Sequence, residues 1–174
     1  MQTLEAIAKR KSTRSYQPKQ IPEEDLQTIL KAGFAAPVAM ARYDSLHITV
    51  VQTQDLLDRI NAAGEEAIAK LLGVRKSMDF GAKTLILVSS TKTHRAGMEY
   101  INVGIVMENM VLAATDLGID TVILGAAPAA VAQDTALVKA LGIPEGYQPI
   151  LGAAFGYGTQ DAPAKEHKIS VNRI

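Results

Sequence analysis

The sequence predicts one domain in which helices cover the faces of a β-sheet. A length of 174 residues is typical of a single domain, and 48% hydrophobic with 21% charged residues is an ordinary globular composition. Short β-branched or apolar runs alternate with longer segments of helical periodicity, which is the pattern of a sheet packed against helices. The chain contains no internal repeat and no low-complexity linker that would divide it.

The first third of the chain contains two predicted helices and one predicted strand. The apolar positions within 4–8 predict a short helix, which ends at the basic residues 9–11. Pro22 and the three acidic residues after it predict the start of a second helix, which Pro37 ends. Residues 46–51 (LHITVV) alternate and are rich in β-branched side chains, which is typical of a strand.

The remainder of the chain continues this alternation and ends in a polar tail with a strand-like piece. The predicted helices are 55–72, 99–117 and 129–141, and the predicted strands are 84–90, 121–125 and 148–158. The helix at 99–117 is apolar nearly all round, which indicates burial on more than one side. A second subunit or the chain's own domain would provide that cover, and composition alone favours neither.

Charge and cysteine content exclude several classes of protein. Eighteen basic residues balance eighteen acidic ones, which argues against a nucleic-acid-binding domain. Without cysteine there is no disulfide framework, no thiolate zinc site and no cysteine nucleophile, and this suits a reducing cytoplasm. The longest apolar stretch carries four polar residues, and the N-terminus lacks the pattern of a secretory signal. We therefore expect a soluble, cytoplasmic protein with no membrane contact.

The motifs of the commonest catalytic sites are missing. His47, His94 and His167 are too far apart for helical metal-ligand spacing, so no metal site is predicted. The chain has neither a G-x-S-x-G nucleophile motif nor a Walker A loop, and the glycines of 152–158 lack the dinucleotide-binding spacing. Those glycines are better explained by close backbone packing within a strand. Any catalysis is therefore expected to come from a bound cofactor rather than from a side chain.

A basic cluster near the N-terminus is the main candidate binding site. Lys9, Arg10, Lys11 and Arg14 lie within six positions, next to Ser12. One interpretation is that the first three cations complement the C-terminal end of the short helix, which leaves Arg14 unexplained. In the other interpretation, these cations and the Ser12 hydroxyl converge on a phosphate.

The order of segments along the chain resembles that of the FMN-dependent nitroreductase family. Residues 10–42 resemble the family's opening, where an R-x-S-x-R/K motif precedes a helix that begins with proline. Residues 100–126 resemble its central helix with the following strand and turn, and 140–158 resemble its LGIPEGY-P segment. The resemblance implies an α+β three-layer sandwich with a central mixed sheet and a domain-embracing homodimer. Residues 1–174 would form one FMN-binding domain, with 159–174 as an arm reaching the partner subunit.

The resemblance also implies a cofactor site divided among four segments of the chain. The matching positions are Arg10, Lys11, Ser12, Arg14, Pro37, Val38, Ala39, Ile123, Leu124, Gly125, Ala126, Lys165 and His167. By this resemblance, Arg10 reaches the FMN phosphate and Arg14 lies towards the pyrimidine edge of the flavin. Residues 37–39 match the partner-chain loop that covers the ring, and the backbone of 123–126 lines flavin N5. His167 departs from the family's K-x-R phosphate pair.

Two departures from the family pattern concern the part of the implied site that would face the substrate. The family's P-S-x-x-N-x-Q-P-W reads PVAMARYDS at 37–45, so the Ser, Asn, Gln and Trp are all replaced. The polar contacts of those residues would be lost or supplied by Arg42 or Tyr43. The region 90–99 is shorter than in larger relatives, which implies a more open site.

The implied activity is that of an FMN-dependent NAD(P)H oxidoreductase. NADH or NADPH would deliver hydride to flavin N5 and leave, and a nitroaromatic, quinone or similar small acceptor would then take the electrons. No side chain would be catalytic, and Arg14 would give electrostatic support to the reduced flavin. The changed residues at 38–43 favour an alternative, a flavin-binding protein for storage or sensing with little turnover. A small nucleic-acid- or anion-binding domain is a second alternative, which the neutral charge disfavours.

Overall fold

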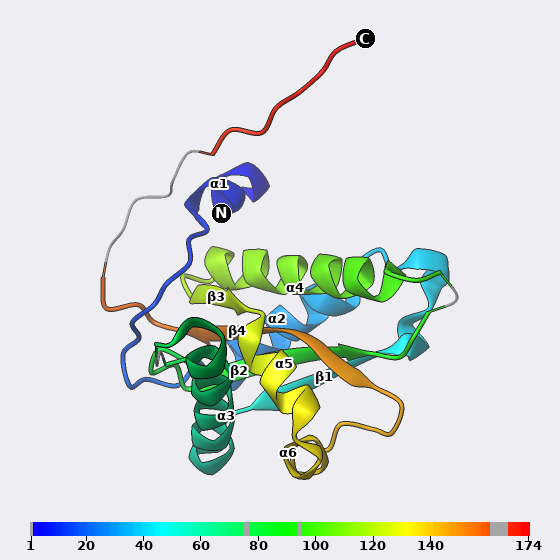
Figure 1. Ribbon diagram of the computed structural model, residues 1–174. Coiled ribbons are helices and arrows are strands. Elements are labelled where there is room, and N and C mark those ends of the chain that lie inside the picture. Colours follow the sequence, from blue (N-terminus) through cyan, green and yellow to red (C-terminus); the bar gives the residue numbers. More distant parts are fainter. Residues whose placement is uncertain (1, 75–76, 94, 161–166) are drawn as a thin grey trace.

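A four-stranded sheet lies between two layers of helices (Figure 1). The computed structural model describes residues 2–74, 77–93, 95–160 and 167–174. The sheet order is β1-β2-β4-β3, with β1 at Leu46–Val51, β2 at Thr84–Ser90, β3 at Asp120–Leu124 and β4 at Gln148–Gly156. The helices are α1 (Thr3–Lys9), α2 (Glu23–Phe34), α3 (Gln54–Leu72), α4 (Met98–Asp116), α5 (Ala126–Gln133) and α6 (Thr135–Ala140). The predicted three-layer α+β sandwich is confirmed.

The central strand β2 shows how the two layers are built. All seven of its residues are buried, which explains the apolar run at 85–88. Ile86 and Val88 pack towards α2 and α4, whereas Leu85 and Leu87 pack towards α3, α5 and α6. Because successive side chains point to opposite faces of a sheet, one strand supplies both cores.

The sheet differs from the predicted mixed sheet, because all three strand pairs are antiparallel. Helix α3 lies at the end of the sheet where β1 stops and β2 begins (Figure 1). The chain therefore re-enters the sheet from the end it left, and β2 runs antiparallel to β1. Within the described residues, parallel pairing is confined to an isolated bridge between Ser12 and Thr121.

Two predicted helices also differ in detail. The helix expected at 129–141 is two helices, because Asp134 has an extended backbone and its side chain caps α6 by accepting from the N–H groups of Ala136 and Leu137. In α1, Leu4 and Ile7 are exposed and Ala6 is buried, so the apolar stripe does not face the core. Residues 167–174 contain no strand and are all exposed.

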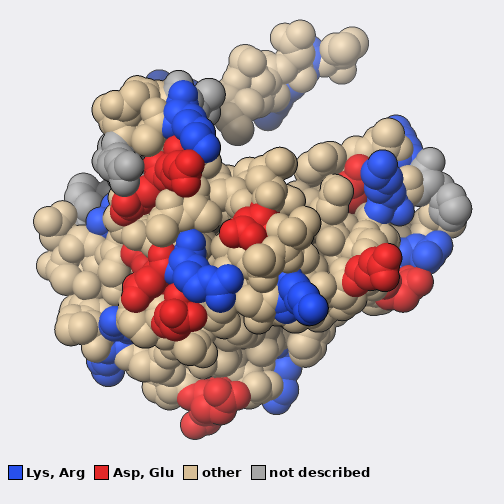
Figure 2. Space-filling view, turned by 60° about the horizontal axis from the view of Figure 1, so that its bottom comes forward, with Lys and Arg blue, Asp and Glu red and all other residues tan. Residues whose placement is uncertain are grey.

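The glycines of β4 and its continuation lie where another side chain approaches closely. A Cβ at Gly152 would come within 2.9 Å of Leu87, and one at Gly156 within 3.0 Å of the Tyr16 ring. The prediction of close packing is therefore confirmed at both positions. Figure 2 shows basic and acidic side chains interspersed on the face in view, with no continuous patch of one sign among the described residues.

Helix α4 is buried on its inner side and incompletely covered on its outer side. Val103, Met107 and Met110 of α4 are fully buried, whereas its residues Tyr100 and Ile101 are 63% and 55% exposed. The N-terminal helix α1 lies above part of α4 (Figure 1). Among the described residues, no helix combines the length and apolarity that a membrane crossing requires.

Candidate functional site

The basic segment that follows α1 is held against the edge strand β3. Ser12 bridges to Thr121, and the Thr13 N–H donates to the Thr121 carbonyl oxygen at 2.9 Å. Further along, Tyr16 pairs with Gly158, so the segment lies between β3 and the chain that leaves β4. Backbone pairing therefore fixes the place of the basic cluster in the fold.

A cavity of about 210 Å³ opens beside this segment. Its lining consists of Lys11, Ser12, Thr13, Arg14, Ser15 and Gln160. The Thr13 hydroxyl is buried and has no hydrogen-bond partner among the described residues. Arg10 lies just outside the lining, where its N–H caps α1 by donating to the Ala6 carbonyl at 3.0 Å. Cations, hydroxyl-bearing residues and an amide along this lining suit the oxygens of a phosphate.

The turn at 123–126 leaves the same edge of the sheet and begins α5. Ile123 and Gly125 are exposed, whereas Leu124 is buried in the core. Gly125 has φ −93° and ψ −35°, which any residue adopts, and a Cβ there would meet no atom within 4 Å. Neither the conformation nor the packing of this chain requires glycine. The turn therefore leaves room for a ligand to approach the backbone N–H groups at the start of α5.

The predicted covering loop at 37–39 lies at the opposite end of the molecule (Figure 1). The Ala39 N–H donates to Asn102 Oδ1 at 3.1 Å, which ties the loop to the first turns of α4. Helix α4 has 19 residues and is about 28 Å long, and the basic segment pairs with β3 beyond its other end. Within one chain, the loop and the basic segment therefore do not form a single site.

The side chains of this loop point in different directions. Val38 is buried among the side chains of α2 and α4, whereas Pro37 and Met40 are exposed. Met40 and Ala41 have φ values of 56° and 53°, in the left-handed region that non-glycine residues seldom adopt. The exposed tip of the loop is therefore set by two strained residues. The resemblance places the family's asparagine at the second of them, and asparagine tolerates this region better than alanine does.

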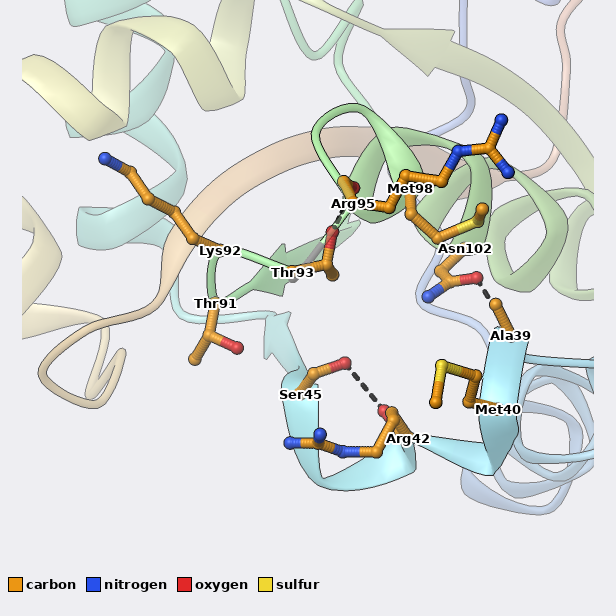
Figure 3. Close-up of a pocket in the computed structure, with 10 residues that line it drawn as sticks. All are labelled: Ala39, Met40, Arg42, Ser45, Thr91, Lys92, Thr93, Arg95, Met98 and Asn102. Atoms are coloured by element: carbon orange, nitrogen blue, oxygen red, sulfur yellow. Dashed lines mark hydrogen bonds between the residues drawn. The ribbon is translucent and has the colours of Figure 1, made fainter.

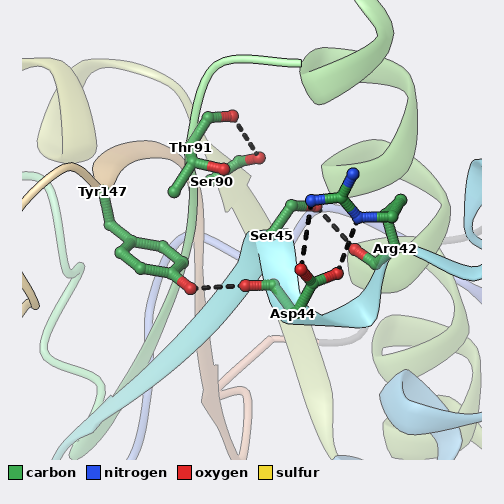
Figure 4. Close-up of polar contacts among 6 residues, drawn as sticks. All are labelled: Arg42, Asp44, Ser45, Ser90, Thr91 and Tyr147. Atoms are coloured by element: carbon green, nitrogen blue, oxygen red, sulfur yellow. Dashed lines mark hydrogen bonds and ion pairs between the residues drawn. The ribbon is translucent and has the colours of Figure 1, made fainter. Parts of the chain in front are cut away.

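The residues after the tip form a compact polar turn, shown in Figure 4. Arg42 pairs with Asp44 through two hydrogen bonds of 2.9 and 3.1 Å. This contact lowers the pKa of the Asp44 carboxyl and raises that of the Arg42 guanidinium, in each case chiefly through the hydrogen bond. The Tyr147 hydroxyl donates to the Asp44 carbonyl, and the Ser45 hydroxyl donates to the Arg42 carbonyl. The loop thus has its own polar contacts in place of those expected from the family pattern.

The last two predicted site residues belong to the C-terminal segment of the chain. Lys165 lies outside the described residues, as does His94. His167 is exposed in the segment 167–174, which projects away from the body beyond α1 (Figure 1).

A family model supplies the deciding observation, because the model described as the Nitroreductase family matches residues 7–157. The chain belongs to the nitroreductase family. This membership confirms the resemblance, and the matched span contains the basic segment, the loop at 37–39 and the turn at 123–126.

Solved nitroreductase structures share the fold over the whole chain. A nitroreductase with bound FMN from Bacteroides fragilis is 31% identical, with a TM-score of 0.84 over 100% of this chain and 97% of that chain. A nitroreductase with bound FMN from Desulfitobacterium hafniense is 28% identical, with a TM-score of 0.86 over 99% of this chain and 100% of that chain. A relative in Archaeoglobus fulgidus, provisionally named NADH dehydrogenase/NAD(P)H nitroreductase, is 29% identical over 88% of this chain and 84% of its own length.

Three residues at these places were absent from the predicted set. Thr13 and Gln160 line the cavity beside the basic segment, and Asn102 holds the loop. Thr13 lies inside the R-x-S-x-R motif, so the motif itself pointed to its position. Asn102 is a buried amide in an apolar helix, and the sequence carried no signal that it bonds a backbone group 63 residues away.

Proposed function

We propose that this nitroreductase-family chain is an FMN-dependent NAD(P)H oxidoreductase. The observation that carries the proposal is the donor-rich cavity at residues 11–15, whose segment pairs with β3, the strand that ends in a turn whose glycine no contact within the chain requires. The unsatisfied Thr13 hydroxyl and the open space at Gly125 fit a phosphate-bearing cofactor with a flat ring. The FMN bound in the B. fragilis and D. hafniense structures supports the same choice.

The chain's own residues would bind and orient the cofactor. Arg10 and Lys11 would hold the FMN phosphate, with the Ser12 and Thr13 hydroxyls as further hydrogen-bonding groups. Arg14 would lie towards the pyrimidine edge, where a positive charge favours added electron density. When bound, FMN would accept hydride from NADH or NADPH and pass electrons to a nitroaromatic, quinone or similar small acceptor. No side chain of this set needs to transfer a proton.

A homodimer would complete each site. The loop at 37–39 lies about one α4 length from the basic segment of its own chain, so a second copy would have to bring the two together. The exposed apolar side chains of α4 support the same arrangement, because a second subunit would cover them. The arm at 159–174 would reach that subunit, and Ile169 and Val171 on it are 87% and 79% exposed.

A visible absorption spectrum of the purified protein, reconstituted with FMN, tests the cofactor and the activity together. We expect a flavin spectrum that bleaches under anaerobic conditions when NADH or NADPH is added, and that returns with a nitroaromatic or quinone. The variant Arg14→Ala should retain FMN more weakly and make the flavin harder to reduce. Lys9→Ala, which removes a cation from the last turn of α1 outside the cavity, is the matched control. Protein that binds no FMN would refute the proposal.

The same experiment separates the alternative favoured by the changed loop. A flavin that binds stoichiometrically but bleaches no faster than free FMN with both nicotinamides would indicate storage or sensing rather than turnover. The midpoint potentials of the native protein and of Arg14→Ala would then still report whether Arg14 lies beside the ring.

A further inference from the structure

The two parts of the proposed cofactor site are each held by a side chain that is distant in the sequence. At the loop of residues 37–39, Asn102 Oδ1 accepts from the Ala39 N–H (Figure 3). Beside the basic segment, Asp120 Oδ2 accepts from the Gly158 N–H at 2.9 Å, and Asp120 is half-buried at the first position of β3. Asp120 and Gly158 do not line the cavity of the basic segment, so an effect on that cavity has to pass through their neighbours.

The Gly158 N–H depends on Asp120 because no backbone carbonyl among the described residues accepts it. The ladder between β3 and β4 ends two residues before Gly158. On its other side Gly158 pairs with Tyr16, but the hydrogen bonds of that bridge are made by the residues flanking the pair. The Gly158 N–H therefore faces β3 beyond the last ladder pair, and the carboxylate satisfies it.

Glycine at position 158 allows the carboxylate and the basic segment to come close together. Gly158 does not have a positive φ, so its backbone conformation does not require glycine. A Cβ there would overlap Asp120 Oδ2 and would lie 3.0 Å from Thr13 Cγ2. Thr13 lines the cavity, so Gly158 is packed between the carboxylate and the cavity wall. Close packing on both sides explains why this residue is glycine.

The residues that follow Gly158 carry its position to the cavity. The Thr159 N–H donates to the Ser15 carbonyl at 3.1 Å, and the Thr159 hydroxyl donates to the Ser15 hydroxyl at 2.7 Å. Ser15 and Gln160 both line the cavity. Thr159 and Gln160 are exposed and lie beyond the end of β4, so the contact at Gly158 fixes where they begin. A segment that is held in place before a ligand arrives does not have to be ordered when the ligand binds.

The charge of Asp120 acts on the basic segment in the opposite sense. Burial raises the pKa of Tyr16, Asp120 raises it further and Arg14 lowers it, so both charges act on one hydroxyl of this segment. A carboxylate makes a stronger hydrogen bond to a backbone N–H than a neutral acceptor does, but its charge also repels a phosphate. The contact and the charge can therefore be separated by a neutral acceptor at position 120.

We propose that Asp120 is a positioning residue for the cavity at residues 11–15. Its carboxylate fixes Gly158, and Gly158 in turn places Thr159 and Gln160 against the basic segment, where the cofactor phosphate binds. The role in cofactor binding rests on the proposed function, whereas the contact between Asp120 and Gly158 does not. Asp120 takes no part in the electron transfer itself.

Fluorescence titration with FMN compares two variants at this position. Asp120→Ala removes the acceptor and should raise the dissociation constant for FMN about tenfold or more. Asp120→Asn keeps an acceptor for the Gly158 N–H and removes the charge, so its dissociation constant should equal the native value or lie below it. Asp134→Ala is the matched control, because the Asp134 carboxylate also accepts backbone N–H groups but does so at the start of α6. That variant should lose stability and keep its affinity for FMN.

A double-variant cycle tests whether Asp120 acts through the residues after Gly158. Gln160→Ala removes an amide from the cavity lining and should raise the dissociation constant for FMN about threefold in the native background. The same change should have no effect in Asp120→Ala, where residue 160 is no longer held at the cavity. Additive effects would contradict the proposed route.

Hydrogen exchange of the FMN-free protein tests the contact itself. The Gly158 amide should exchange about tenfold faster or more in Asp120→Ala than in the native protein, and close to the native rate in Asp120→Asn. Thermal unfolding is measured alongside. If Asp120→Ala does not fold, Gly158→Ala breaks the same contact from the other side, because its methyl group overlaps Asp120 Oδ2, and it should lose FMN affinity to a similar extent.

Two results would overturn the proposal. FMN affinity in Asp120→Ala equal to that of the native protein would show that the contact does not affect the cavity. An equal loss of affinity in Asp120→Asn and Asp120→Ala would show that the hydrogen-bond acceptor is not what matters. Native protein that binds no FMN would instead reject the proposed function and the role of Asp120 in cofactor binding together, and the exchange rates would then decide the contact alone.

Discussion

The Ala41 N–H donates to the Val38 carbonyl at 3.0 Å, and Ala41 makes this contact with a left-handed backbone. A left-handed conformation costs an alanine about 1–2 kcal/mol, because its Cβ crowds the following carbonyl oxygen. Glycine adopts the same conformation without that clash. The backbone at the loop tip is thus strained, and contacts on both sides of the tip hold it in place. Before the tip, the Ala39 N–H bonds to Asn102, and after it residues 42–45 form the polar turn.

We predict that Ala41→Gly raises the free energy of unfolding by about 1 kcal/mol, measured by urea denaturation. Ala62→Gly, at an exposed site inside α3, is the matched control and should lower it by about 0.5–1 kcal/mol. If both variants lose stability to the same extent, the loop at 41 does not have a left-handed backbone.

The hydroxyl of Tyr16 gives a second prediction about stability. It is buried and has no hydrogen-bond partner among the described residues, and Phe would remove the unsatisfied group without changing the ring. Tyr16→Phe should therefore be neutral or stabilising by up to about 1 kcal/mol. Tyr43→Phe is the control, since the Tyr43 hydroxyl donates to the Ala36 carbonyl at 3.0 Å, and its loss should cost about 1 kcal/mol.

Alkaline pH provides an independent measurement on the same residue. Burial raises the pKa of Tyr16 far above its usual value of 10.0, and the Asp120 carboxylate acts in the same direction while Arg14 opposes it. Above pH 10 the unfolded chain releases this proton and the native chain keeps it, so the stability contributed by Tyr16 falls as pH rises. The fall in melting temperature between pH 9 and pH 11 should be smaller in Tyr16→Phe. An identical pH dependence would show that Tyr16 is not buried.

Much of the fold could be predicted because its strongest signals are local. The alternation in β1 and the continuous apolar run of β2 each depend on only a few neighbouring residues, and both strands lie where they were predicted. The break at Asp134 was missed because the sequence on both sides of it has helical periodicity, and only the cap reveals two helices. The antiparallel pairing was missed because it depends on where α3 returns the chain, which no local pattern encodes.

The candidate site also combines residues that the local sequence predicts with residues whose contacts depend on the distant parts of the chain. The cluster at 10–14 could be found because three cations and two hydroxyls lie close together in the sequence. The hydrogen bond from the Ala39 N–H to Asn102 Oδ1 joins residues 63 positions apart, and neither residue type indicates this contact in the sequence. Likewise, the burial of Val38 follows from the packing of α2 against α4, so its place in the loop did not show which way its side chain points.

The exposed apolar surface on the outer side of α4 leads to a prediction that the chain forms a dimer. Ile101 is 55% exposed on this side, and the proposed homodimer would bury it. We expect Ile101→Arg to raise the dissociation constant of the dimer at least 100-fold, about 2.8 kcal/mol, because a charge would be buried without a partner. Sedimentation equilibrium measures this directly. Ala62→Arg, exposed on α3, should leave the association unchanged, and an undisturbed dimer in Ile101→Arg would place the interface elsewhere.

Gly125 predicts opposite effects on folding and on cofactor binding. Its backbone is in a region that alanine adopts freely, and a Cβ would meet no atom of the chain within 4 Å. Gly125→Ala should therefore stabilise the FMN-free protein by about 0.4–1 kcal/mol, because the unfolded chain loses freedom. The added methyl group would occupy the space left for the flavin, so the dissociation constant for FMN should rise at least tenfold, about 1.4 kcal/mol.

Fluorescence titration with FMN and thermal unfolding without it measure the two effects of Gly125→Ala on the same preparation. The reverse change, Ala129→Gly at an exposed site further along α5, should lower stability and leave FMN affinity unchanged. If folding required glycine at position 125, Gly125→Ala would instead make the FMN-free protein less stable, and the affinity for FMN would fall because of that loss of stability. A gain in stability together with a loss of FMN affinity has a simple physical cause, which is that the ligand and not the chain requires the small residue at 125.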